Sequence, residues 1–156
     1  MILIGENIHI ISKTISAALR ERQPGPIQEL ARAQAEAGVD YIDLNIGPAR
    51  KNPDIMEWLV NVVQEVTDLP LSLDTTNPVA MEAGLKVCQR RPLINSASGK
   101  QESKEQMMPL AVKYDADIVV SVLTDQGIPP DAPARVEAIL ETVAYANELG
   151  IPNERI

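Results

Sequence analysis

The sequence predicts an α/β protein built on parallel β-strands, because short apolar runs alternate with longer amphipathic segments along its 156 residues. We expect these runs to be strands with apolar residues on both faces, which is typical of a parallel sheet covered by helices. Polar residues gather at the carboxyl ends of these runs. Together, these observations favour a (β/α)8 barrel of the TIM-barrel type, of which this chain covers about the first five βα units.

Five runs are too short for helices and are therefore expected to be strands. They are Ile2–Ile4, Tyr41–Asn45, Leu71–Asp74, Leu93–Ser96 and Asp117–Leu123.

Between the strands, apolar residues recur at the i, i+3, i+4, i+7 spacing of a helix with one buried face. This pattern predicts helices along Ile55–Val66, Met107–Tyr114 and Val136–Ala144. We expect three more helices, from Ser12 to Arg22, from Ile27 to Gly38, and along the segment that carries Val79, Ala83 and Val87. Asn77-Pro78 suits the start of the last of these, as an N-cap followed by a first-turn proline.

The competing architecture is a doubly wound open sheet. No Gly-x-Gly-x-x-Gly follows any predicted strand, so the main signal for a dinucleotide-binding open sheet is absent. A complete barrel takes about 250 residues. We therefore expect residues 1–156 to be the N-terminal portion of a single barrel domain, completed by a longer chain or by another chain. Because an incomplete sheet exposes strand edges, we also expect a homodimer.

Composition excludes several classes of function. A net charge of −8 and a pI near 4.6 argue against a nucleic-acid partner, which needs clustered Lys and Arg. No apolar run approaches the roughly 18 residues of a membrane span, so we expect a cytoplasmic protein. The single cysteine and the single histidine make an internal disulfide impossible and a protein-built metal site unexpected.

The polar residues at the strand ends form the candidate site. Glu6 and Asn7 follow the first predicted strand, Asp43 and Asn45 lie in the second, Asp74 ends the third, and Asn95 and Ser96 end the fourth. In a barrel these positions converge on one mouth, where the active site lies. An ionised aspartate at the end of a buried strand needs hydrogen-bond donors, because an uncompensated charge is costly in an apolar setting.

The pieces "GEN" (5–7), "DLNIGP" (43–48), "LDTTN" (73–77) and "INSASG" (94–99) resemble the pterin-binding family. That family contains dihydropteroate synthase, the folate domain of cobalamin-dependent methionine synthase and the methyltetrahydrofolate:corrinoid methyltransferases. The sequence looks most like the last group, which shares "MEWL" (56–59) and "EAGLK" (82–86) with it in the same order.

The resemblance implies that Asp74 and Asn95 bind the pterin, with Asp43, Asn45, Glu6 and Ser96 beside them. A carboxylate can accept two adjacent hydrogens from the aminopyrimidine edge, and an amide offers both a donor and an acceptor. In the family, a third ring-binding carboxylate and an asparagine that approaches N5 lie on later strands, beyond Ile156.

The reaction implied is transfer of the N5 methyl group of methyltetrahydrofolate to the cobalt of a corrinoid (cobalamin) carried by a partner protein. Proton or hydrogen-bond donation to N5 would assist it. Two alternatives remain open at this point: a non-catalytic pterin-binding or assembly module formed by a partial barrel, and a dihydropteroate synthase.

One departure from the family pattern falls on the first strand. The family usually reads Gly-Glu-Arg-x-Asn, whereas this chain reads Gly5-Glu6-Asn7-Ile8-His9. Asn7 removes a fixed positive charge, and His9 replaces an amide by a titratable ring. Both are further candidate site residues, and they could mark a different methyl donor, acceptor protein or pH response.

Overall fold

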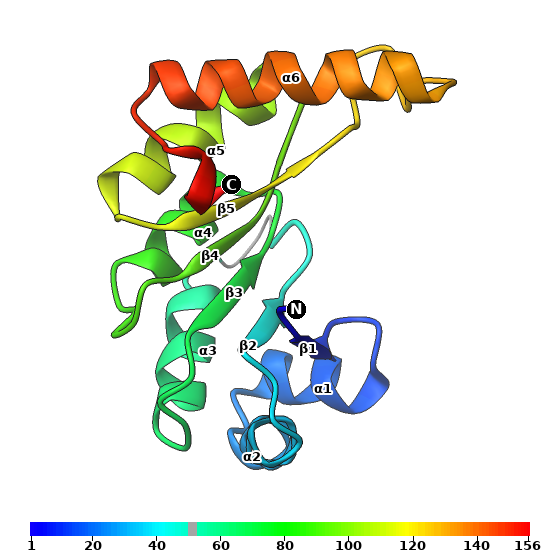
Figure 1. Cartoon of the computed structure of the whole chain (residues 1–156). Helices are drawn as coiled ribbons and strands as arrows, with labels where there is room; N and C mark the ends of the chain where they lie inside the picture. Colours follow the sequence, from blue (N-terminus) through cyan, green and yellow to red (C-terminus); the bar gives the residue numbers. More distant parts are fainter. Residues whose placement is uncertain (50–52) are drawn as a thin grey trace. The chain divides into compact units, whose positions relative to one another are not determined.

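The computed structural model describes residues 1–49 and 53–156, which divide into two compact units, Met1–Pro92 and Leu93–Ile156. The described chain contains five strands and six α-helices in alternating order, with a short 3-10 helix at the end (Figure 1). This α/β alternation confirms the predicted fold class. None of the helices in the described residues is long and apolar enough to cross a lipid bilayer.

The first unit contains three parallel strands in the order β1, β2, β3, which are Ile4–His9, Tyr41–Asn45 and Leu71–Asp74. Because successive residues of a strand point to opposite faces, β2 and β3 each have an apolar face and a polar face. The apolar face carries Ile42, Leu44, Leu71 and Leu73, all at most 2% exposed. The polar face carries the candidate residues.

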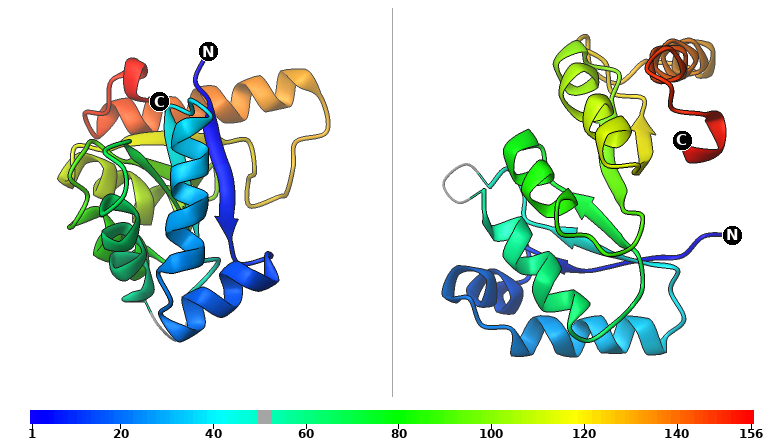
Figure 2. Two further views of the ribbon diagram at one scale, coloured as in Figure 1. Left: turned by 90° about the horizontal axis from the view of Figure 1, so that it is seen from below. Right: turned by 90° about the vertical axis from the view of Figure 1, so that its left-hand side faces the viewer.

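Four helices belong to the first unit: α1 (Lys13–Glu21), α2 (Gly25–Glu36), α3 (Ile55–Gln64) and α4 (Pro78–Leu85). The predicted N-cap is confirmed at Asn77, whose side chain accepts the N–H groups of Val79 and Ala80; at α1, the Ser12 side chain accepts the Ile15 N–H. α2 runs alongside β1 (Figure 2). α3 packs against both α2 and α4 and supplies much of the core through Met56, Leu59, Val60, Val62 and Val63.

The face that α4 buries is not the one that carries Val79. Val79 is 62% exposed, and the helix instead buries Ala80, Met81, Gly84 and Leu85. Gly84 explains the choice of face, because a Cβ atom there would lie 2.5 Å from Cγ of Met56 on α3 and 3.0 Å from Cδ1 of Leu73 on β3. The missing side chain allows α4 to pack closely against its neighbours.

The bounds predicted for the first strand were wrong. Ile2 is 69% exposed, and β1 runs from Ile4 to His9, so Glu6 and Asn7 lie within the strand and not after it. The register with β2 shifts between Gly5 and Ile8, which marks a β-bulge. In the amide orientation that satisfies both groups, the buried Gln34 side chain accepts the Asn7 N–H (3.1 Å) and donates to the Gly5 carbonyl (3.2 Å). Two polar residues therefore fit inside a strand whose Ile8 stays buried.

The second unit contains the parallel strands β4 (Leu93–Ser98) and β5 (Asp117–Ser121), the helices α5 (Gln101–Lys113) and α6 (Ala132–Glu148), and the 3-10 helix Asn153–Arg155. β4 extends beyond its predicted end at Ser96. β5 ends before Leu123, close to a turn in which Thr124 and Gly127 exchange backbone hydrogen bonds. The guanidinium of Arg155 bonds the carboxylates of Asp115 and Asp117, which fastens the 3-10 helix to the start of β5.

The buried face predicted for α6 is also wrong. The sequence pattern assigned Val136, Ile139, Leu140, Val143 and Ala144 to it, yet Val136 is 57% and Leu140 63% exposed. The side chains that α6 does bury are Thr142 and Ala146. Periodicity indicates which face a helix can bury, but within the described chain no element covers this one.

Candidate functional site

The carboxyl ends of β2 and β3 bring two polar residues into direct contact. Asn45 and Asp74 lie opposite one another in the parallel register, and Nδ2 of Asn45 donates a hydrogen bond to Oδ2 of Asp74. The other end of the same amide, Oδ1, accepts the Gly47 N–H at 3.0 Å. Asn45 therefore ties the Asp74 carboxylate to the loop that follows β2.

A second polar pair lies two residues earlier on the same two strands. Asp43 is opposite Ser72 in the register, and Oγ of Ser72 donates to Oδ1 of Asp43 at 2.5 Å. Both residues are buried, with 3% and 0% of their surface exposed. Because residues two apart on a strand share a face, this pair lies directly beneath Asn45 and Asp74.

The surroundings of Asp74 change its acidity. The pKa of this carboxyl is raised from its usual 3.8 to about 6, chiefly by burial and also by the negative charges of Asp43 and Glu6, while the hydrogen bond from Asn45 lowers it. Within the described residues, Asp74 accepts a hydrogen bond from Asn45 alone among side chains. The carboxylate is thus short of donors and can take up a proton or accept N–H groups from a ligand.

The loop after β3 is held by two residues that were not among the predicted site residues. Thr75 is 1% exposed and its hydroxyl donates to the Gly47 carbonyl, while Nδ2 of Asn77 donates to the Ala49 carbonyl at 3.3 Å. These bonds fix the loop after β3 to the loop after β2. The signal that could have revealed this role is a short polar run, Thr75-Thr76-Asn77, immediately after a strand-end aspartate.

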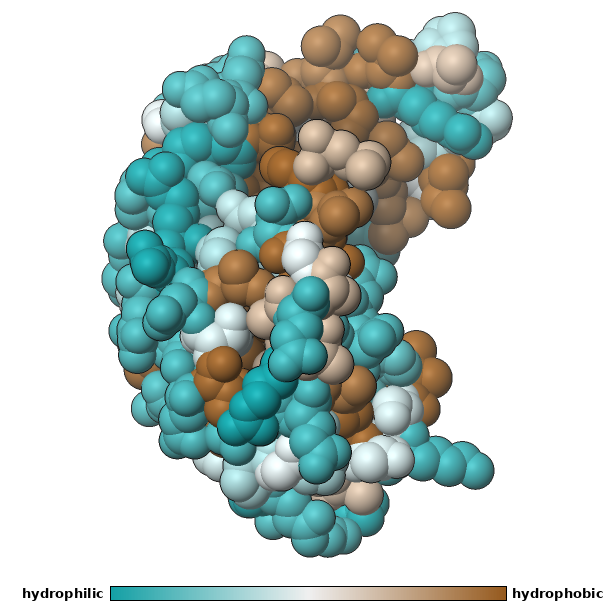
Figure 3. Space-filling model, turned by 60° about the horizontal axis from the view of Figure 1, so that its bottom comes forward, coloured by the Kyte–Doolittle hydropathy of each residue, from teal (hydrophilic) through white to brown (hydrophobic). Residues whose placement is uncertain are grey.

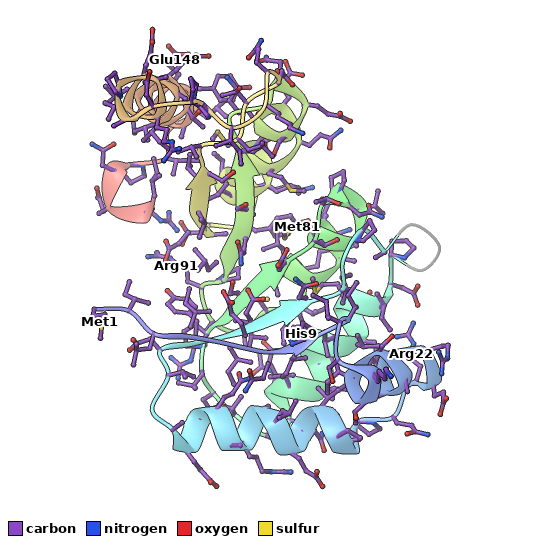
Figure 4. The ribbon with its side chains drawn as sticks, turned by 90° about the vertical axis from the view of Figure 1, so that its right-hand side faces the viewer. Met1, His9, Arg22, Met81, Arg91 and Glu148 are labelled. Atoms are coloured by element: carbon purple, nitrogen blue, oxygen red, sulfur yellow. The ribbon has the colours of Figure 1, made fainter. Side chains whose placement is uncertain are left out.

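β1 contributes the remaining candidates of the first unit. Glu6 and Asn7 are exposed at the bulge, and Glu6 lies close enough to raise the pKa of Asp74. His9 ends the strand in register with Asn45, and Figure 4 labels it there. Its Nδ1 accepts the Ser12 N–H at 3.2 Å, so a neutral ring carries its proton on Nε2. His9 therefore also helps to start α1.

The candidates of the second unit lie on β4. Asn95 and Ser96 are partly buried and fall where the register between β4 and β5 shifts, between Ile94 and Ala97. Register shifts of this kind redirect side chains and are frequent beside active sites. Both β1 and β4 thus carry an irregularity at their candidate residues.

No cluster of three or more His, Cys, Asp or Glu side chains in residues 1–49 and 53–156 is arranged to hold a metal ion.

Comparison with known proteins places the chain in a family. A family model described as "Pterin binding enzyme" matches residues 13–156. The methylcorrinoid:tetrahydrofolate methyltransferase of Eubacterium limosum is 31% identical over 162 residues, covering all of this chain and 59% of that protein. The crystal structure of 7,8-dihydropteroate synthase from Vibrio fischeri ES114 superposes with a TM-score of 0.73 at 19% identity, covering 99% of this chain and 60% of the other.

The chain thus spans about three-fifths of the length of these two proteins. The structural likeness shows the fold, which is the predicted pterin-binding α/β barrel in part. With the polar strand ends in place and the family model matching nearly the whole chain, this protein belongs to the pterin-binding enzyme family.

Proposed function

We infer that this chain is the pterin-binding portion of a methyltransferase that moves the N5 methyl group between a tetrahydrofolate and the cobalt of a corrinoid carried by a partner protein. The methyltransferase similarity supports this reaction class. That relative is named for transfer from a methylcorrinoid to tetrahydrofolate, which is the reverse of the direction that the sequence resemblance implies. Which direction operates depends on the methyl donor that the cell supplies.

The observation that carries the proposal is the donor-poor carboxylate of Asp74. An aminopyrimidine edge presents two neighbouring N–H groups, and an ionised carboxylate accepts both side by side. The N–H groups of such a ligand stabilise the ionised form of Asp74. They take the place of the water lost on burial and counteract the negative charges of Asp43 and Glu6. We assign Asn95 to the same ring, where its amide can serve donor and acceptor positions together.

The residues around Asp74 act mainly by positioning it. Asn45 holds the carboxylate through one hydrogen bond, and Asp43, fixed by Ser72, places a negative charge beneath it. We assign Glu6, Asn7 and Ser96 to the rim of the site. His9 bonds the Ser12 N–H through Nδ1, which leaves Nε2 for any contact with a ligand.

Methyl transfer from methyltetrahydrofolate breaks the bond from N5 to the methyl carbon, and N5 takes up a proton as the methyl group leaves. The partner's corrinoid supplies the cobalt that receives it. This chain binds and orients the pterin, which can contribute a large part of the rate enhancement. The resemblance places the N5 hydrogen-bond donor on later strands, so catalysis requires chain beyond Ile156.

Calorimetry with methyltetrahydrofolate tests the assignment. We expect Asp74→Asn and Asn95→Ala each to weaken binding by roughly 10- to 100-fold, because each removes a hydrogen bond to a charged or buried group. Glu57→Gln is the control, since Glu57 is an exposed acid on α3. Unchanged affinity in both site variants would exclude the proposed site.

The pH dependence of binding provides an independent test. Because the ligand donates to the ionised carboxylate, affinity should be constant above the pKa of Asp74, about 6, and fall roughly tenfold per pH unit below it. Asp43→Asn removes a charge that raises this pKa, so the midpoint should move to lower pH. An affinity that stays constant across the assay range, from about pH 4.5 to about pH 7.5, contradicts the role of Asp74.

The two other candidate functions make different predictions. Dihydropteroate synthase activity requires condensation with p-aminobenzoate, and the likeness to that enzyme at 19% identity supports the fold but not the activity. A non-catalytic assembly module requires a stable oligomer, which a mass measurement by light scattering detects.

A further inference from the structure

Three polar side chains form a single row across the strands of the first unit. His9 on β1 is in register with Asn45 on β2, and Asn45 is in register with Asp74 on β3 (Figure 4). Residues in register on neighbouring strands point to the same face of a sheet, so the three share one face at the carboxyl ends of the strands. We call His9, Asn45 and Asp74 the polar row.

The residues one position earlier show which face carries the polar row. Ile8, Leu44 and Leu73 are also in register with one another, and all three are fully buried. Because successive residues of a strand alternate between faces, the polar row lies on the opposite face. Each of its members is partly exposed. A ligand can therefore reach all three side chains.

The middle of the polar row is occupied by internal hydrogen bonds, whereas its two ends have capacity for a ligand. The Asn45 amide donates to Asp74 and accepts the Gly47 N–H. At one end, the Asp74 carboxylate is short of donors. At the other end, Nδ1 of His9 accepts the Ser12 N–H, which places the proton of the neutral ring on Nε2, and Nε2 has no hydrogen-bond partner within residues 1–49 and 53–156. The polar row thus presents an acceptor at one end and a fixed donor at the other.

The other conspicuous surface of the described chain has no such order. Apolar surface is visible over the second unit in the upper part of the space-filling view (Figure 3), where Ile128, Val136 and Leu140 are each more than half exposed. Apolar side chains offer no donors or acceptors, so they do not select a ligand by hydrogen bonding. The polar row can do so because its donor and its acceptor lie at opposite ends.

The spacing and polarity of the polar row match those of a two-ring heterocycle. Neighbouring strands lie about 4.8 Å apart, so the Cα atoms of His9 and Asp74 are separated by roughly 10 Å. The two side chains reach toward a ligand from either end of this span. A tetrahydropterin has neighbouring N–H groups on its aminopyrimidine edge and a lone pair at N5 on its other ring, so it offers donors to Asp74 and an acceptor to His9.

We propose that the Nε2–H group of His9 donates a hydrogen bond to N5 of the tetrahydropterin whose aminopyrimidine edge is held by Asp74. This N5 contact rests on the proposed function, because it needs the pterin at Asp74. The resemblance places an asparagine near N5 on later strands, so His9 is an additional donor from the first strand. A donor at N5 stabilises the electron pair that stays on this nitrogen when the methyl group leaves.

Calorimetry with two ligands that differ at N5 tests the contact. One is tetrahydrofolate, and the other is 5-deazatetrahydrofolate, in which a carbon atom replaces N5 and offers no lone pair. We expect His9→Asn to weaken the binding of tetrahydrofolate by roughly 5- to 30-fold and to leave that of the deaza analogue unchanged within about twofold. In the unsubstituted chain, tetrahydrofolate should bind at least about fivefold more tightly than the analogue.

The choice of variants separates the two nitrogens of the ring. In His9→Asn, the amide oxygen can still accept the Ser12 N–H, but no group remains at the position of Nε2. His9→Gln is the rescue variant, because its longer amide reaches that position, and it should bind tetrahydrofolate within about fivefold of the unsubstituted chain. Ser12→Ala is the control for the start of α1. It removes the side-chain cap and keeps the backbone N–H, so both affinities should stay the same.

Asp74→Asn distinguishes failure of the N5 contact from failure of the pterin site, because it should weaken both ligands alike. If it does so while His9→Asn weakens both ligands equally, or neither, the N5 contact is wrong and the pterin site stands. If Asp74→Asn weakens neither ligand, the pterin site and the N5 contact are both excluded. Should His9→Asn fail to fold, equal affinities of the unsubstituted chain for the two ligands overturn the proposal without any variant.

Discussion

α3 and α6 have the same apolar spacing in the sequence and opposite exposures in the structure. α3 buries five side chains of its ten residues, whereas α6, with seventeen residues, buries Thr142 and Ala146. The difference arises from their neighbours: α3 packs against two helices, α2 and α4, while α6 contacts the strand β5 and is joined to α5 by the ion pair of Lys104 with Glu141. An amphipathic pattern predicts the face that prefers burial, but the burial itself depends on what lies next to that face.

The largest expected effect comes from truncating a leucine in each helix. Leu59 of α3 is fully buried, so Leu59→Ala should lower the free energy of unfolding by about 3 kcal/mol. Leu140→Ala in α6 should change it by less than about 0.5 kcal/mol, because that side chain is 63% exposed. Urea titration followed by circular dichroism measures both values. Equal losses would show that the two helices are equally well packed in solution.

Gly84 tests how closely α3 and α4 approach each other. Gly84→Ala places a Cβ atom 2.5 Å from Cγ of Met56, which should cost about 2 kcal/mol despite the better helix propensity of alanine. Met56→Ala in the same protein removes the overlapping atom, so the double variant should be less destabilised than the sum of the two single ones. Strictly additive losses would mean that the helices are farther apart than described.

Asp74 should make the first unit less stable at neutral pH. A carboxyl whose pKa is raised to about 6 contributes stability below pH 3.8 and loses it as the pH rises through 6. Asp74→Asn should therefore raise the free energy of unfolding by about 1 kcal/mol at pH 8, after allowance for partial exposure, and leave it unchanged near pH 3.5. Denaturant titrations at the two pH values measure the difference. A gain that is independent of pH would refute the electrostatic explanation.

The smallest expected effect is that of the ion pair that fastens α6. Glu141 is 74% exposed, so Glu141→Gln should cost at most about 0.5 kcal/mol and less in high salt. Glu105→Gln on α5, another exposed acid of the same unit, is the comparison. A loss above about 2 kcal/mol would show that Lys104 depends on this partner for its burial.

The sequence predicted the parts of the fold that local patterns determine. The cap at Asn77 and the bounds of β2 and β3 are confirmed, because capping residues and short apolar runs act over a few positions. The bounds of β1 were not predicted, since its bulge depends on Gln34, which lies on α2 and far away in the sequence. The exposed face of α6 was missed because spacing within a helix says nothing about its neighbours.

The sequence indicated which polar residues of β2 and β3 come together, but not how they pair. Residue type and strand position indicated Asp43, Asn45 and Asp74, and the structure brings them together on one face of the sheet. The division into two pairs, Asp43 with Ser72 and Asn45 with Asp74, requires the register between the strands, which no local pattern contains. The roles of Asp43, Asn45 and Asp74 in pterin binding remain predictions, as do those of Asn95, Ser96, Glu6, Asn7 and His9.

The side chain of Gln34 makes β1 tolerant of change at two positions. The Gln34 side chain hydrogen-bonds the backbone groups of Gly5 and Asn7. The exposed side chains of residues 6 and 7 are therefore not needed to hold the bulge. Substitutions at these two positions should have little effect on stability as long as the buried Ile8 is kept. These two positions are therefore suitable sites for altering ligand preference, by natural divergence or by a combinatorial library.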